Sequence, residues 1–166
     1  MESQSGYEKA QEAIGFIGSL TDKERRAIEK HAERASATED VISEISDTVG
    51  ATKACGECGG MCCFPDVQDF LDVSDYVYTF LKIPEDTRIK VLDALEKSGK
   101  GDVYCALVED GGCMLPGDAR PYICKSFNCV RTSHKMNEAQ IFIDILERRF
   151  KDFKSSLKRI KGFVET

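Results

Sequence analysis

Eight cysteines occupy the middle of this chain of 166 residues, and all of them lie between residues 55 and 129. In a secreted protein, this density would indicate a disulfide framework. The first residues, MESQSGYEKAQEA, form neither the basic nor the apolar part of an export signal. We therefore expect a cytoplasmic protein, in which a reducing environment favours thiolates bound to metal over disulfides.

Length and composition indicate one soluble globular domain. Hydrophobic residues make up 42% of the chain and charged residues 31%, and a chain of this length has material for one modest core. No apolar run approaches the roughly 18 residues of a membrane span. We divide the single domain 1–166 into N-terminal helices (1–50), a cysteine-rich metal-binding core (51–130) and a long C-terminal helix (137–164).

The net charge of -6 is unevenly distributed along the chain. Residues 131–166 contain 9 basic and 5 acidic side chains, a balance of +4, whereas both preceding segments are acidic. A nucleic-acid-binding protein would need a larger basic surface with interleaved aromatic residues. We expect neither a nucleic acid nor a membrane as partner, and interpret the basic tail as a solvated helix face.

The first 50 residues predict three short helices. The first has one apolar stripe, formed by Tyr7, Ala10, Ile14 and Ile17. Thr21 followed by Glu24 has the spacing of a capping box that starts a second helix, and Ser36 with Glu39 repeats this signal for a third. Gly50 ends the series.

The middle of the chain predicts two more helices and a short hairpin. Asp66 is the expected N-cap of the first helix, and residues 84–99 form the second. The apolar stripe of the first comprises Val67, Phe70, Leu71, Val77, Tyr78 and Leu81. Residues 103–108 and 113–115 are predicted to be strands joined by a turn over 109–112. Cys105 and Cys113 would then lie on opposite strands of a hairpin. The expected fold class is therefore mainly α, a small helical domain with a short β-hairpin and cysteine-rich loops.

The last segment, from Asn137 to Val164, has the clearest helical pattern. Its apolar residues are spaced by three and four positions along about 35 Å, at ~1.5 Å per residue; they are Phe142, Leu146, Phe150, Phe153, Leu157, Ile160 and Val164. Such a seam must be covered. We expect it to pack on the N-terminal helices, with a protein partner or a homodimer as the alternative.

The stretch ACGECGGMCCFPD contains four of the eight cysteines. Cys55 and Cys58 have the two-residue spacing that lets both sulfurs reach one ion, and Cys62 adds a third sulfur at a workable distance. Cys62 and Cys63 point in different directions, so they should serve different sites, unless Cys63 is only a small buried hydrophobe. Eight thiolates would satisfy two tetrahedral zinc sites, two iron–sulfur clusters, or one cluster with four cysteines left over.

The cysteine pattern over residues 55–129 resembles the YkgJ-like family of zinc- or iron-chelating domains, known by its CxxCxxCC motif. The matching motifs are CGECGGMCC and YCALVEDGGCMLPGDARPYICKSFNC. Carried over residue by residue, the resemblance implies metal ligands at Cys55, Cys58, Cys62, Cys63, Cys105, Cys113 and Cys124, with Cys129 completing eight. Two departures are a three-residue gap before the vicinal pair and Leu115-Pro116 after the Gly-Cys turn. A flagellin lysine methylase is among the larger relatives of this family.

Iron–sulfur is favoured over zinc, because structural zinc sites usually pair two CxxC knuckles and only one is present. We favour a 4Fe–4S over a 2Fe–2S cluster. Arg120 and Lys125 lie between the expected ligands and would donate to cluster sulfurs or balance their charge, unless they are ordinary surface charges.

Two functional classes follow. In one, the cluster serves redox chemistry, electron transfer or sensing. In the other, zinc folds an interaction module that binds through its long helix. A methyltransferase-type activity, as in the methylase relative, is a further alternative, but the chain contains no Gly-rich nucleotide fingerprint. Whether the chain is an enzyme stays open, and no catalytic residue is predicted.

Overall fold

Helices contain 79% of the residues that the computed structural model describes. The described residues are 4–51, 53, 57, 70–98, 105–109, 112–126, 135–160 and 163. Six α-helices lie wholly within these ranges, and none of them is long and apolar enough to cross a membrane. The mainly helical fold class expected from the sequence is confirmed.

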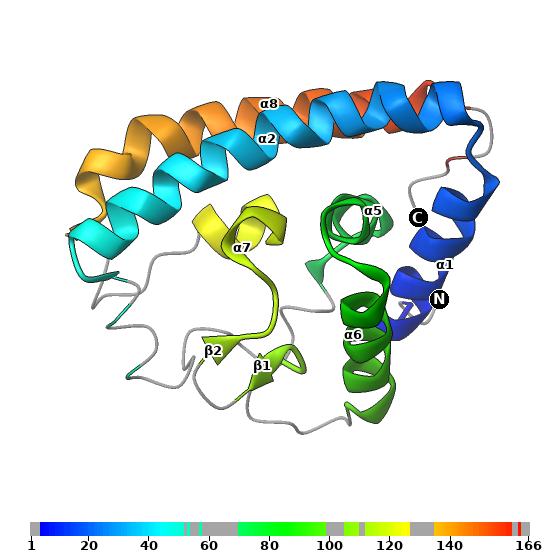
Figure 1. The fold of residues 1–166 in the computed structure, drawn as a ribbon, viewed down its shortest axis with the longest axis horizontal. Helices are drawn as coiled ribbons and strands as arrows, with labels where there is room; N and C mark the ends of the chain where they lie inside the picture. The colour runs from blue at the N-terminus through cyan, green and yellow to red at the C-terminus, as the bar shows by residue number, and fades with distance from the viewer. Residues whose placement is uncertain are drawn as a thin grey trace.

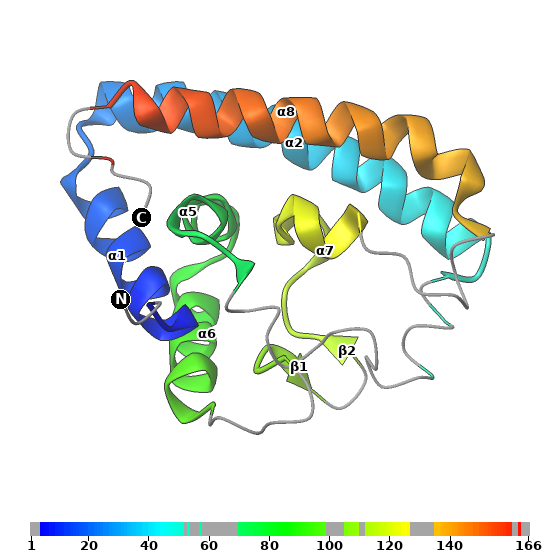
Figure 2. The same cartoon turned by 180° about the vertical axis from the view of Figure 1, so that it is seen from behind.

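The two longest described helices, α2 (Asp22–Thr48) and α8 (Gln140–Lys158), lie side by side along the molecule (Figures 1 and 2). The face that α8 turns inward contributes five buried side chains, which are Ile143, Leu146, Phe150, Phe153 and Leu157. Small residues on α2, such as Ala32 and Ala35, are buried and allow the helices to approach closely. The guanidinium of Arg149 adds a hydrogen bond to Thr38 Oγ1 at 2.6 Å. The apolar seam is therefore covered by the same chain, as expected.

The boundaries of α8 differ from the predicted range 137–164. Residues Asn137–Ala139 form a 3₁₀ turn, and the α-helix ends at Lys158. The Phe163 amide donates to the carbonyl of Ile160, and its ring meets Phe16 of helix α1 edge-on at 4.9 Å. The chain thus turns back toward the N-terminal helix where the pattern predicted a continuing helix. Val164 lies outside the described residues.

Helix α2 is one continuous helix of 27 residues, so the prediction of two separate helices in this region was wrong. Its start is as predicted, because the Thr21 hydroxyl accepts from the amide of Glu24 and the Glu24 carboxylate accepts from the amide of Thr21. Ser36 and Glu39, which mimic a second capping box, are both buried within the helix. Since no Gly or Pro interrupts residues 22–48, nothing in the backbone ends the helix there.

Helix α1 (Gly6–Ser19) begins with a capping box between Ser5 and Glu8 that the sequence reading missed. The predicted stripe is correct in direction, since Ala10 and Ile17 are buried and Tyr7 and Ile14 pack against the core from its edge. Helix α6 (Glu85–Lys97) lies as predicted within residues 84–99, begins directly after Pro84 and buries Val91 and Leu95. Helices α1 and α6 gather at one end of the molecule (Figure 1).

Helix α5 spans Val73–Lys82 and occupies the centre of the core. Its N-cap is Asp72, and the helix predicted to run on from residue 66 is interrupted, because Phe70 is helical but Leu71 and Asp72 are not. The predicted N-cap, Asp66, lies outside the described residues. Phe70, predicted to be buried, is 70% exposed and lies before this interruption. The rings of Tyr78 and Phe150 approach to 4.5 Å, which joins α5 to α8.

The strands are far shorter than predicted. Among the described residues, β1 (Val108–Glu109) pairs antiparallel with β2 (Gly112–Cys113), and Val108 lies opposite Cys113. Residues 105–107 form a turn instead of strand, so Cys105 is not the cross-strand partner of Cys113. This two-residue pairing and the five-residue helix α7 (Tyr122–Ser126) lie on the side of α2 and α8 that also holds α5 (Figure 1).

Candidate metal centre

Three of the eight expected metal ligands fall within the described residues: Cys105, Cys113 and Cys124. No disulfide joins any two of them. The other five, which are Cys55, Cys58, Cys62, Cys63 and Cys129, lie outside the part of the chain that the structure describes. Within the described ranges, no three side chains from His, Cys, Asp and Glu are grouped so as to hold an ion. A complete site would therefore draw on residues beyond these ranges.

Cys105 is the most enclosed of the three thiols, with 8% of its surface exposed. Burial raises the pKa of this thiol, an amide hydrogen bond from Leu107 lowers it, and the nearby Cys113 raises it again; the net direction is upward. A neutral thiol is thus favoured in the absence of a cation. A bound metal ion would reverse this preference, because a coordinating thiol is deprotonated outright.

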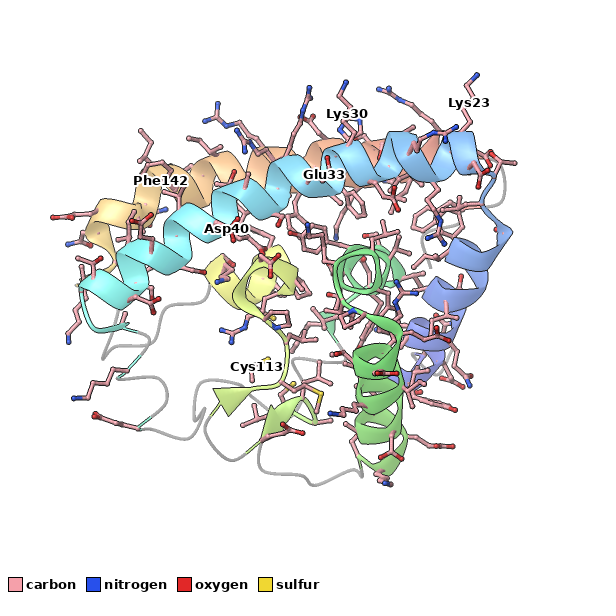
Figure 3. The ribbon with its side chains drawn as sticks, viewed as in Figure 1. Lys23, Lys30, Glu33, Asp40, Cys113 and Phe142 are labelled. Atoms are coloured by element: carbon pink, nitrogen blue, oxygen red, sulfur yellow. The ribbon has the colours of Figure 1, made fainter. Side chains whose placement is uncertain are left out.

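Cys113 ends β2 and is half-buried. It lies at β2, below helix α7 in the view of Figure 3. The backbone carbonyl of Leu115, two residues later, accepts a hydrogen bond of 3.0 Å from Arg120 Nε. This contact holds the guanidinium of Arg120 against the segment that carries Cys113.

Cys124 occupies the short helix α7 and is exposed. Its amide donates to the carbonyl of Pro121 at 2.9 Å, which closes the first turn of α7 directly after the Arg120-Pro121 corner. The neighbouring Lys125 is directed at α2, where its Nζ donates to Ser43 Oγ at 3.0 Å. Lys125 is therefore a half-buried tie between two helices, and its charge lies close enough to Cys124 for the two to interact.

Gly117 makes this tie between α7 and α2 possible. A Cβ at position 117 would lie 2.9 Å from Ser43 Oγ and 3.5 Å from Lys125 Nζ. Gly117 belongs to the 3₁₀ turn η1 (Gly117–Ala119), which packs on both α2 and α5. Any larger residue would compete with the Ser43 hydroxyl for the same space.

Turn η1 is attached to the core by buried polar side chains. The Tyr78 hydroxyl donates to the carbonyl of Asp118 and the Thr79 hydroxyl to that of Ala119, each at 2.9 Å. On the other side, Ser36 Oγ donates to the Asp118 carboxylate at 3.4 Å. Burial raises the pKa of Tyr78, so that its phenol stays protonated and remains a donor. These contacts position the Arg120–Lys125 segment relative to the helices.

Glu39 is a functional candidate that the sequence reading missed, having treated it as a cap. Its side chain is 0% exposed, and neither carboxyl oxygen has a hydrogen-bond partner among the described residues. Burial raises the pKa of Glu39 to about 9, against the opposing charge of Lys125. The nearby Tyr78 hydroxyl gives its proton to Asp118 instead. A buried carboxyl without a hydrogen bond is costly, and each such group requires an explanation.

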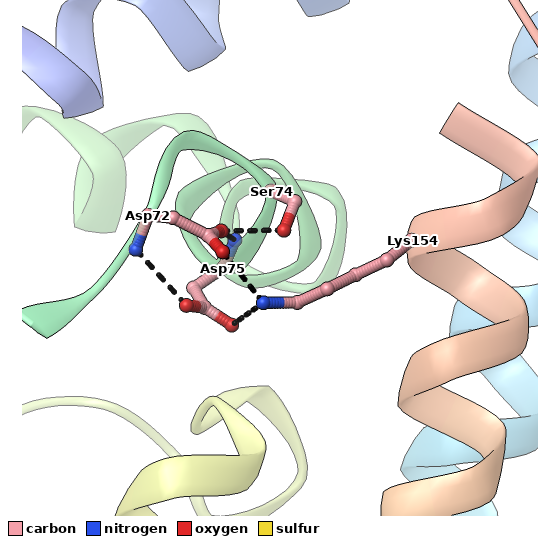
Figure 4. A network of polar contacts seen from close by, with 4 residues as sticks. All are labelled: Asp72, Ser74, Asp75 and Lys154. Carbon is pink, nitrogen blue, oxygen red and sulfur yellow. Dashed lines mark hydrogen bonds and ion pairs between the residues drawn. The ribbon is translucent and has the colours of Figure 1, made fainter. Parts of the chain in front are cut away.

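Three polar residues at the start of α5 and Lys154 of α8 join the two helices (Figure 4). Lys154 Nζ lies 2.7 Å from the carboxylate of Asp72 and 3.4 Å from that of Asp75, and the Ser74 hydroxyl also donates to Asp72. Burial and the negative charge of Asp72 raise the pKa of Asp75 to about 6. For Asp72, burial acts upward but hydrogen bonds from Lys154 and Ser74 outweigh it, and its pKa is lowered. This network fixes the point at which the chain re-enters the described core after the first cysteine cluster.

Thiols with adjoining cations are the ligands and surroundings that soft metal ions and iron–sulfur clusters require. Comparisons of the chain with models of protein families, with curated proteins and with solved structures found no match. The family resemblance of the cysteine motifs therefore stays a prediction.

Proposed function

We propose that the chain is a metal-binding protein whose cysteines hold an iron–sulfur cluster, 4Fe–4S in preference to 2Fe–2S, for redox chemistry, electron transfer or sensing. The observation that carries this proposal is the confinement of all eight cysteines to residues 55–129, between helical segments that contain none. Such a cluster supplies one-electron transfer at a potential set by its surroundings. Cys105, Cys113 and Cys124 are the described residues that would hold it.

The composition of the hydrophobic core supports the redox role over a structural zinc site. Most of the buried core residues that the structure describes are apolar side chains of the helices, and Cys105 is the one cysteine among them. Because these helices bury each other, a metal ion is not needed to hold them together. A small domain folded around zinc, in contrast, gains most of its folding free energy from the metal.

The cations next to the thiols also support a negatively charged cluster. Arg120 is held by the carbonyl of Leu115, and Lys125 interacts with Cys124 while bound to Ser43. Positive groups near ligating sulfurs balance the charge of a thiolate-ligated cluster and shift its reduction potential. Their location within the cysteine-bearing unit is what such a role requires.

Anaerobic purification followed by iron, sulfide and zinc analysis tests the proposal. We expect stoichiometric iron and sulfide, broad visible absorption that bleaches with dithionite, and a paramagnetic signal in one of the two redox states. Colourless protein with stoichiometric zinc and no redox signal would establish the structural zinc module instead. Protein that contains neither metal when freshly prepared under reducing conditions would refute metal binding altogether.

A further inference from the structure

Cys105 begins a turn that a backbone hydrogen bond closes. The amide of Val108 donates to the carbonyl of Cys105 at 3.0 Å and closes a four-residue turn. Cys105 itself is 8% exposed, so this turn holds its thiol in the buried part of the molecule.

Cys113 belongs to the same hydrogen-bonded unit. It lies opposite Val108 in the β1–β2 pairing, and the amide of the next residue, Met114, donates to the carbonyl of Leu107 at 2.8 Å. The turn residues Leu107 and Val108 are thus bonded on one side to Cys105 and on the other to the strand that carries Cys113. The backbone therefore fixes the position of Cys105 relative to Cys113.

Apolar anchors hold this unit in place without any metal. Leu107 and Leu115, which flank the β1–β2 pairing, are each 3% exposed and belong to the hydrophobic core. The two thiols are not joined in a disulfide. A pair of sulfurs positioned in advance by a buried loop loses little conformational entropy when it binds an ion.

We propose that Cys105 and Cys113 form a two-thiolate half-site that binds one and the same metal ion or cluster. This inference rests on the proposed function and answers a question that the sequence leaves open, namely how the eight cysteines divide among sites. The remaining ligands of that ion or cluster come from the other six cysteines. Loss of either member of the pair therefore removes the whole ion or cluster, and loss of both removes nothing more.

Metal content of three alanine variants tests the pairing: Cys105→Ala, Cys113→Ala and the double variant. We expect each single variant to lose one full ion or cluster per chain, and the double variant to lose the same amount. Ile89→Ser, at an exposed position of α6 outside the half-site, leaves both thiols intact and should keep the wild-type content. Additive losses in the double variant, or an undiminished content in either single variant, would overturn the inference while leaving the proposed function in place. Metal-free wild-type protein would overturn both.

A labelling experiment on the wild-type protein gives the same information without any substitution. Trypsin releases residues 101–125 as one peptide, because cleavage after Arg120 is blocked by Pro121, and this peptide contains Cys105, Cys113 and Cys124. Metal is withdrawn with increasing chelator, and iodoacetamide is then added. The reaction rate of each thiol in fully metal-free protein serves as the reference. We expect Cys105 and Cys113 to lose protection at the same chelator concentration. Separate release would contradict the shared half-site.

Discussion

Replacing Glu39 by methionine removes the one carboxyl group of the described core that is fully buried and has no described hydrogen-bond partner. Methionine has a similar volume and no charge. Because burial raises the pKa of Glu39 from 4.5 to about 9, the folded protein keeps this proton across a range of pH in which the unfolded chain releases it. The folded state therefore binds more protons than the unfolded state between these two values, and its stability falls as pH rises through the window.

The size of the effect follows from the same two pKa values. Each pH unit within the window costs about 1.4 kcal/mol, so that the penalty grows by about 3 kcal/mol between about pH 5.5 and about pH 7.5. Above about pH 9 it reaches its full value of about 6 kcal/mol, as an upper limit. Glu39→Met abolishes this term. The variant should gain stability relative to the wild type, and the gain should increase with pH.

Urea unfolding at a series of pH values measures this gain, with both proteins in the same metal state. For Glu39→Gln, the stability difference from the wild type should change with pH in the same way but differ by a constant amount. This variant also removes the titrating carboxyl group but retains a polar group. Glu44→Gln, at an exposed position of the same helix, serves as the control and should give a difference that does not vary with pH. A stability difference between Glu39→Met and wild type that is flat from pH 5.5 to 8 would refute the reasoning.

Three further substitutions test other parts of the structure. Lys154→Met leaves Asp75 without its cation and should lower the free energy of unfolding by about 2–3 kcal/mol at pH 8. This loss of stability should be smaller near pH 5, because the Asp75 carboxyl takes up a proton there. An equal loss at both pH values would contradict the ion-pair argument. Gly117→Ala should cost about 1 kcal/mol in chemical denaturation because its Cβ displaces the Ser43 hydroxyl, and it should cost nothing in a Ser43→Ala background. Phe153→Ala should destabilise the protein by about 3–5 kcal/mol, because the Phe153 ring of α8 is 0% exposed and packs on Tyr78 of α5. A loss below about 1 kcal/mol in thermal or urea unfolding would show that the two helices do not pack there.

The helices that the sequence predicted well are those with purely local signals. The Thr21–Glu24 capping box, the helix after Pro84 and the apolar seam of α8 each depend on residues within one or two turns of each other. Ser36 and Glu39 have the residue types and the spacing of a capping box but lie in the middle of α2. A cap and a buried mid-helix position differ only in their tertiary environment, and the local sequence does not determine that environment.

The start of α5 was misplaced for a similar reason. Asp66 and Asp72 are both able to cap a helix, and the apolar pattern runs past both of them. In the structure, Asp72 caps α5, and its carboxylate also binds Lys154, 82 residues further along the chain. Patterns of neighbouring residues do not predict a contact over such a separation.

By itself, the sequence determined the helical class, the main apolar faces and the identity of the thiols available to a metal, because these depend on local spacing and on residue chemistry. Only the tertiary structure decided which groups surround those thiols. It brought Lys125 to Ser43 and Ser36 to Asp118, each across 82 residues, and enclosed Glu39 beside them. The burial of a side chain and the electrostatic potential around it depend on all the groups that pack there. Both are therefore set only when segments that are distant in the sequence come into contact.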